Sequence, residues 1–151
     1  ALGEFRQLGD DRAIAATLRE MGRAEKMQGN LAEATRLYEQ ALAIFRQVAD
    51  PISVAWALRA LAGIERRCGR LSQAQDLAEQ AIENLRPVGN REELVQLLLE
   101  AGRIAVLADD HDRARTHLGE AMALADDLGD REGADMAREE LTKLCPASPR
   151  A

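Results

Sequence analysis

Aromatic residues and cysteines are scarce in this chain. Phe, Trp and Tyr together make up 3% of its 151 residues, and the only cysteines are Cys68 and Cys145. Because these two match no disulfide framework and no metal-ligand motif, we expect reduced thiols in a cytoplasmic protein. The sequence also has no signal peptide and no apolar run near the roughly 18 residues of a membrane span.

Sequence signatures of enzymes are missing as well. The chain has no glycine-rich phosphate loop, no GxSxG nucleophile motif and no HExxH zinc motif. The acidic run Asp109-Asp110-His111-Asp112 would point its ligands in different directions from a helix start, and no glycine turn completes a calcium loop. We therefore expect a non-catalytic protein that holds no metal and no cofactor.

The residues that are abundant favour a folded, helical protein. Hydrophobic residues make up 46% of the chain and charged residues 30%, which is ordinary for a globular domain. Ala, Leu, Arg and Glu dominate, and all four are good helix formers. The formal net charge of −6 argues against binding to nucleic acid or to an anionic membrane.

The strongest pattern is a repeat with a period of forty residues. The opening segment ALGEFRQLGD reappears as ALAIFRQVAD at residues 41–50, and Ala34 recurs as Ala74 and Ala114. A period in this range is typical of stacked repeat proteins, whose units bury their apolar faces only against neighbouring units.

Each unit is expected to contain two helices. In the first unit Ile14, Leu18 and Met21 have the i, i+4, i+7 spacing of one buried helical face, and Gly29 and Asn30 interrupt the pattern before the second helix. Short polar residues at one phase of the repeat can cap the following helix; these are Asp10, Asp50, Asn90 and Asp130. The expected helices are 1–8, 11–28, 31–48, 51–68, 71–88, 91–108, 111–128 and 131–145.

This pattern predicts an all-α fold, a right-handed α-solenoid of antiparallel helix pairs, with no sheet. We expect Pro87 to shorten its helix by about a residue or two. Arg138 stands at a core phase, and such polar substitution is typical of a terminal repeat, so we expect a C-terminal fragment of a longer protein. The single domain 1–151 divides into a half unit 1–9, units 10–49, 50–89 and 90–129, a terminal helix 130–145 and a flexible tail 146–151.

The units resemble the tetratricopeptide repeat. The family pattern W-x2-L-G-x2-Y…A-x3-F aligns in the first unit with Leu18, Met21, Gly22, Glu25, Ala34 and Tyr38. The unit is about six residues longer than the usual 34 and lacks the closing proline, so it is similar to a long-helix variant of bacterial multidomain regulators. The resemblance implies a module that binds proteins or peptides in a concave groove, as the sensor or scaffold region of a larger regulator.

Basic residues form a stripe beside the core stripe of the first helices. In the first unit Arg19, Arg23 and Lys26 follow the i, i+4, i+7 spacing, and the later members of the stripe are Arg59, Arg66 and Arg103. The resemblance places this stripe on the concave wall, where guanidinium groups suit carboxylates. We therefore predict binding of an acidic segment. The alternative is a solvated face whose charges pair with Glu20, Glu65 or Glu100.

Trp56, the only tryptophan, is expected to face the same groove. It is either a binding anchor or a residue that packs across adjacent first helices, whereas Tyr38, Phe45 and Phe5 repeat at a core phase.

Two other functions stay open. The chain could be a self-association module, since Leu2 and Phe5 lack partners, or a sensor whose groove closes on a small-molecule effector.

Overall fold

The computed structural model describes residues 2–144, with side chains described from residue 7 onward. Over that range the fold is all-α and has no strand, as predicted. The helices are α1 (Leu2–Met27), α2 (Leu31–Gln47), α3 (Pro51–Arg67), α4 (Leu71–Leu85), the 3-10 helix η1 (Arg86–Val88), α5 (Arg91–Leu107), α6 (His111–Leu128) and α7 (Arg131–Thr142). None of these helices combines the length and apolarity that a membrane crossing requires.

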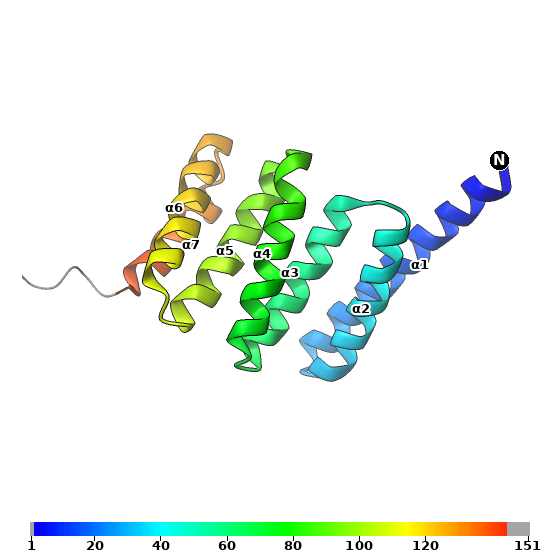
Figure 1. Cartoon of the computed structure of the whole chain (residues 1–151), viewed down its shortest axis with the longest axis horizontal. Coiled ribbons are helices and arrows are strands. Elements are labelled where there is room, and N and C mark those ends of the chain that lie inside the picture. The colour runs from blue at the N-terminus through cyan, green and yellow to red at the C-terminus, as the bar shows by residue number, and fades with distance from the viewer. Residues whose placement is uncertain (1, 145–151) are drawn as a thin grey trace, which may run out of the picture.

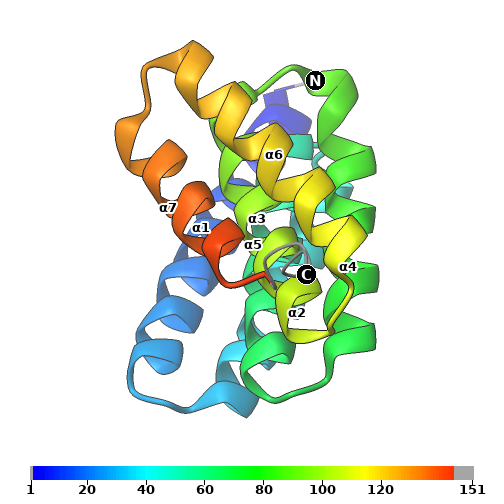
Figure 2. The same cartoon turned by 90° about the vertical axis from the view of Figure 1, so that its left-hand side faces the viewer.

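The helices pack as successive hairpins in one row (Figure 1). The pairs α1–α2, α3–α4 and α5–α6 form the units, while α3 also packs on α5 and α5 on α7. Figure 2, which looks along the row from the α7 end, separates the first helices of the units from the second helices α2, α4 and α6. The first helices α1, α3, α5 and α7 therefore form one face of the molecule, which we call the first-helix face.

Small residues allow the two helices of each unit to approach closely. Ala34, Ala74 and Ala114 hold the same position in three second helices, and each is fully buried. Tyr38 and Phe45 are also buried, as predicted, whereas Phe5 lies outside the residues with described side chains. The core is thus a repeated layer of side chains between helices, which is the expected design of a repeat protein.

The predicted helix caps are present at three of the four sites. The side chains of Asp50, Asn90 and Asp130 accept hydrogen bonds from backbone N–H groups three residues later, at donor–acceptor distances of 3.2, 2.9 and 2.8 Å. The prediction for Pro87 is also confirmed, because α4 ends at Leu85 and the 3-10 helix η1 follows.

The fourth predicted cap, at Asp10, is wrong. Helix α1 continues without a break through Gly9 and Asp10, so the separate helices expected over 1–8 and 11–28 are one helix. A turn at Asp50 is held by the packing of α2 against α3, but Leu8 and Ile14 are 43% and 51% exposed and have no such packing. Without tertiary contacts to hold a turn, helical hydrogen bonding continues through the glycine at a cost of about 1 kcal/mol.

The predicted core face of α1 is only partly buried. Ile14 and Met21 are 51% and 49% exposed, although Val54 and Leu61, their counterparts in the next unit, are buried. In the second unit α2 covers this face, and among the described residues no equivalent helix packs on the face of α1. The repeat alignment identified the correct face, but its burial depends on a neighbouring unit.

The turns between helices use a left-handed residue that is not always glycine. Gly29, Gly69, Gly89 and Gly129 have φ between 73° and 85°, but Ala49 and Asp109 occupy the same turn with φ of 52° and 61°. At Ala49 the N–H of the next residue, Asp50, donates to Phe45 O at 3.0 Å. Two turns therefore contain a residue with a Cβ in a conformation that favours glycine.

We expect Ala49→Gly to stabilise the protein by about 1 kcal/mol, because it removes the left-handed strain of an exposed alanine while the chain entropy of glycine offsets part of the gain. Urea denaturation followed by circular dichroism measures the change. The matched control is Ala13→Gly within α1, which is also exposed and should lose about 0.5–1 kcal/mol. Equal losses in both variants would show that the turn at Ala49 carries no strain.

Candidate binding surface on the first-helix face

All seven residues predicted for the binding site lie on first helices. Arg19, Arg23 and Lys26 are on α1; Trp56, Arg59 and Arg66 are on α3; and Arg103 is on α5. Lys26, Trp56, Arg59 and Arg66 line one small cavity. Arg19 reaches the same cluster because its guanidinium carbon lies 5.2 Å from the centre of the Trp56 ring.

The later members of the basic stripe form ion pairs between units. Each arginine donates from Nε to a glutamate on the next first helix. The pairs are Arg59 with Glu93 at 2.8 Å, Arg66 with Glu100 at 2.7 Å, and Arg103 with Glu140 at 3.4 Å. We call this series the inter-unit ladder. It holds the first helices of neighbouring units together, so these arginines are partly neutralised before any partner arrives.

The sequence-based alternative, in which the stripe pairs with nearby acids, named some of these glutamates and missed others. Glu100 does pair with Arg66, but Glu65 pairs with Arg70, whose hydrogen bond lowers the pKa of Glu65. Glu93 and Glu140 were not identified. The first two pairs share a separation of 34 residues, which is six less than one repeat. This constant separation was the signal in the sequence that could have identified Glu93.

The first unit does not take part in the ladder. Among the described side chains, the one carboxylate within ion-pair distance of Arg19 and Arg23 is Glu20 of their own helix, at 3.3 and 4.0 Å. Among the side chains that the structure describes, no carboxylate lies within ion-pair distance of Lys26. Burial, followed by repulsion from Arg59 and Arg67, lowers the pKa of Lys26. The positive charge at this end of the face is therefore the least compensated part of the stripe.

Trp56 packs against the preceding unit, and its role as a binding anchor stays a prediction. Its ring packs edge-on against Tyr38, with centroids 5.4 Å apart and planes at 80°, while Arg19 covers one side. The residue remains partly exposed. The hydroxyl of Tyr38 beneath it is buried and unpartnered among the described residues, and burial raises the pKa of Tyr38. Trp56 is thus held in one orientation at the edge of the cavity.

The cavity between α1, α3 and α5 has a volume of about 110 Å³. It is lined by Lys26, Trp56, Arg59, Ala60, Gly63, Arg66, Arg67 and Glu100. We call it the basic pocket, because four of these side chains are cationic and one is a carboxylate. Within residues 7–144 no group of three or more His, Cys, Asp or Glu side chains could hold a metal ion.

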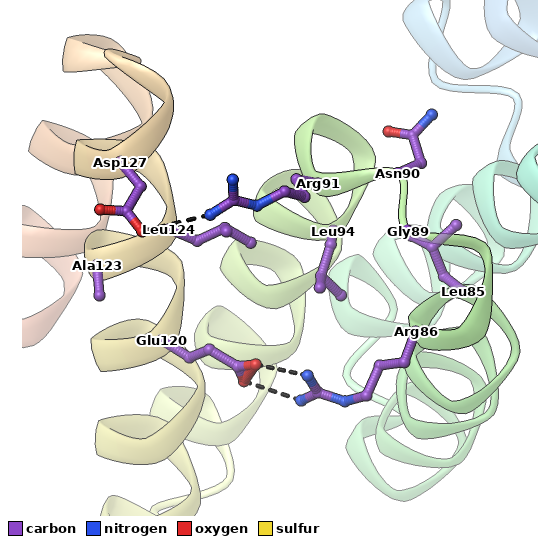
Figure 3. A pocket seen from close by; sticks show the side chains of 10 residues that line it. All are labelled: Leu85, Arg86, Gly89, Asn90, Arg91, Leu94, Glu120, Ala123, Leu124 and Asp127. Carbon is purple, nitrogen blue, oxygen red and sulfur yellow. Dashed lines mark hydrogen bonds and ion pairs between the residues drawn. The ribbon is translucent and has the colours of Figure 1, made fainter.

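A second cavity, of about 330 Å³, lies between the end of α4 and helix α6 (Figure 3). Arg86 of η1 spans it and donates two hydrogen bonds to Glu120, at 2.5 and 2.8 Å. These hydrogen bonds lower the pKa of Glu120. Arg91 and Asp127 form a second ion pair across it, at 3.3 Å. Both arginines are already bound to acids of this chain, so the cavity is a weaker candidate for an anionic ligand than the basic pocket.

Comparison with known proteins agrees with the fold. Two family models described as Tetratricopeptide repeat match residues 14–52 and 53–127. No curated protein matches the chain.

Among solved structures, similarity extends to nearly identical TPR-like repeats assigned to a kinesin light chain of Podosopora anserina, with 20% identity and a TM-score of 0.70 over 86% of this chain and 64% of that one. BtubC (BKLC) from P. vanneervenii matches with 16% identity and a TM-score of 0.65 over 91% of this chain and 68% of that one. The chain thus spans less than two thirds of the first of these structures, and at these identities the likeness concerns the fold. On the two family matches, the chain belongs to the tetratricopeptide repeat family.

Proposed function

We propose that this chain is a non-catalytic interaction module that binds an acidic segment of a partner protein along the first-helix face. Tetratricopeptide repeats generally mediate protein–protein interaction, which supports the first part of the proposal. The observation that carries the second part is the uncompensated charge beside an oriented tryptophan. Lys26 lies close to Arg59 and Arg67 without a carboxylate of its own, next to Trp56 and the basic pocket.

The chemistry of this surface favours carboxylates together with an apolar side chain. Guanidinium groups bind carboxylates through paired N–H donors, and a partly exposed tryptophan offers a large rigid contact area. An acidic segment with an apolar residue near its carboxylates satisfies both. In line with the family resemblance, we propose that the module is the sensor or scaffold region of a larger cytoplasmic regulator.

Fluorescence of Trp56 tests this proposal directly, because the chain has one tryptophan. We expect a glutamate-rich peptide to change its emission, and affinity to fall steeply with salt because the contacts are charged. A lysine-rich peptide of equal length is the control ligand. Lys26→Glu should weaken binding at least about tenfold, whereas Arg46→Glu, an exposed arginine on α2, should leave it nearly unchanged. Equal affinity for both peptides would rule out the acidic-segment proposal.

Self-association is the second candidate, because α1 exposes part of the face that other units bury. Ile14 and Met21 are 51% and 49% exposed. In the second unit the equivalent face is covered by a second helix of the preceding unit, so another copy of the chain could cover it here. Sedimentation velocity over a range of concentrations decides this candidate, and a monomer throughout would exclude it for this chain.

A further inference from the structure

One position of the first helices is acidic in every unit except the second. Glu20, Glu100 and Glu140 are separated by multiples of forty residues, and the residue at this phase in the second unit is Ala60. The substitution lies on the wall of the basic pocket, since Ala60 lines it. The pocket therefore stands where the repeat would otherwise place a glutamate side chain.

The later units show what that glutamate does. Glu100 of the third unit is 8% exposed and accepts from Arg66 of the preceding unit at 2.7 Å, while Arg103, one turn further on, lies 3.8 Å away. In the fourth unit Glu140 likewise binds a cation of the preceding unit, Arg103 at 3.4 Å, although Arg103 lies three residues earlier in its unit than the counterpart of Arg66, which is Val106. Glu140 also accepts from Lys143 of its own unit at 2.9 Å. A carboxylate at this phase thus sits between a cation of the preceding unit and one of its own unit.

In the second unit both members of this arrangement are replaced by small residues. Ala60 stands in place of Glu100, and Gly63 in place of Arg103. The cations of the preceding unit remain, because Lys26 corresponds to Arg66 and Arg23 corresponds to Arg103. Lys26 of the first unit therefore faces the basic pocket, whereas its counterpart Arg66 of the second unit faces the carboxylate of Glu100.

The basic pocket is lined mainly by positively charged side chains. Lys26, Arg59, Arg66 and Arg67 surround it, against the single carboxylate of Glu100. Gly63 keeps it open, since a Cβ at this position would lie 3.2 Å from Glu100 Oε1. The volume of about 110 Å³ suits one carboxylate group.

We propose that the basic pocket is a carboxylate subsite, in which one carboxylate of the ligand takes the place that the glutamate holds in the other units. The inference rests on the proposed function and narrows it to one residue of the acidic segment, an Asp or Glu that anchors beside Trp56. Arg66 and Arg103 then have a mainly structural role in the inter-unit ladder, and Lys26 with Arg67 provides the charge that the ligand compensates. Burial, followed by repulsion from Arg59 and Arg67, lowers the pKa of Lys26, and the attraction of Glu100 only partly opposes this.

The experiment supplies the missing carboxylate within the chain. Ala60→Glu should pair with Lys26 as Glu100 pairs with Arg66, raise the melting temperature by about 2–4 °C, and weaken binding of the glutamate-rich peptide at least about tenfold. Ser53→Glu is the matched control, because Ser53 is the counterpart of Glu93 and the substitution adds the same charge to the same helix, outside the basic pocket. It should weaken binding less than about threefold. Circular dichroism confirms that both variants are folded, and Lys26→Gln tests the subsite without adding a side chain to the pocket.

The outcomes separate the subsite from the proposed function. If the peptide binds the natural chain and both Glu variants equally well, the acidic-segment proposal stands and the carboxylate subsite is wrong. If the two Glu variants weaken binding equally, the effect is general electrostatics and the subsite is again wrong.

The source of the carboxylate is tested with glutarate as a small probe, by NMR titration of the Gly63 amide. If glutarate shifts this resonance in the natural chain and not in Ala60→Glu, while the peptide fails to bind, the subsite is supported and its ligand is a small carboxylate. The proposed protein-binding function is then wrong. If neither glutarate nor the peptide perturbs Gly63 or Trp56, both proposals are overturned.

Discussion

Gly102→Ala is expected to destabilise the protein by about 2–3 kcal/mol, although it replaces a helical glycine with the best helix former. A Cβ at this position would lie 2.3 and 2.5 Å from Leu118 Cδ2 and Cγ. Leu118 is fully buried in α6, so it cannot turn away into solvent. The overpacking therefore outweighs the gain in helix propensity of about 1 kcal/mol. Chemical denaturation in urea measures the loss.

The repeat itself suggests the compensating change. The second unit has Ala62 where the third has Gly102, and Ala78 where the third has Leu118. Leu118→Ala alone should cost about 2–5 kcal/mol as a cavity. The double variant should be more stable than the sum of the two losses by about 1–2 kcal/mol, because the new methyl group fills part of that cavity. Strict additivity would show that the two residues do not share one space.

Gly119→Ala is the matched control for helix propensity. Gly119 lies within α6 directly after Leu118, but a Cβ there would meet nothing within 4 Å. The substitution should therefore stabilise the protein by about 0.5–1 kcal/mol. If both glycine substitutions were stabilising, the close approach of α5 and α6 at Leu118 would be wrong.

These paired positions show why so much of the fold could be predicted from the sequence. The forty-residue period identifies helix pairs, and the caps at Asp50, Asn90 and Asp130 mark the helix starts to the residue. Both signals are local or strictly periodic, so they do not depend on knowing the neighbouring helices. The cap at Asp10 failed for the opposite reason, since a turn there needs tertiary packing, and Leu8 and Ile14 on either side of it are 43% and 51% exposed.

The candidate site was predicted less completely, because its charges are shared between units. Sequence spacing found the stripe Arg19, Arg23 and Lys26, which lies on one helix. It did not find that Arg59 is bound to Glu93, since the pair joins residues 34 apart on different helices. The offset between neighbouring first helices decides which acid meets which base, and that offset is set by side-chain packing in the core. The basic pocket could not be predicted for the same reason, because its lining residues come from three different helices.

Glu100→Gln should destabilise the protein by about 2–3 kcal/mol, because the loss of one carboxylate leaves several partly buried cations without their counter-ion. Glu100 is 8% exposed, accepts from Arg66 at 2.7 Å and lies 3.8 Å from Arg103. It also attracts Lys26. Glu20→Gln is the control at the same phase of the first unit, where the carboxylate is exposed and its pairs are weak. It should cost no more than about 0.5 kcal/mol.

Glu100→Gln should weaken folding but strengthen binding of the peptide. Glu100 is the one acid that lines the basic pocket, so its neutralisation raises the positive potential there. We expect Glu100→Gln to bind the glutamate-rich peptide about three- to tenfold more tightly at low salt, with the gain reduced at high salt because charge screening weakens it. Denaturation in urea and titration of Trp56 fluorescence on one sample measure both quantities. A variant that lost stability and affinity together would indicate that Glu100 shapes the pocket, and that its charge does not compete with the ligand.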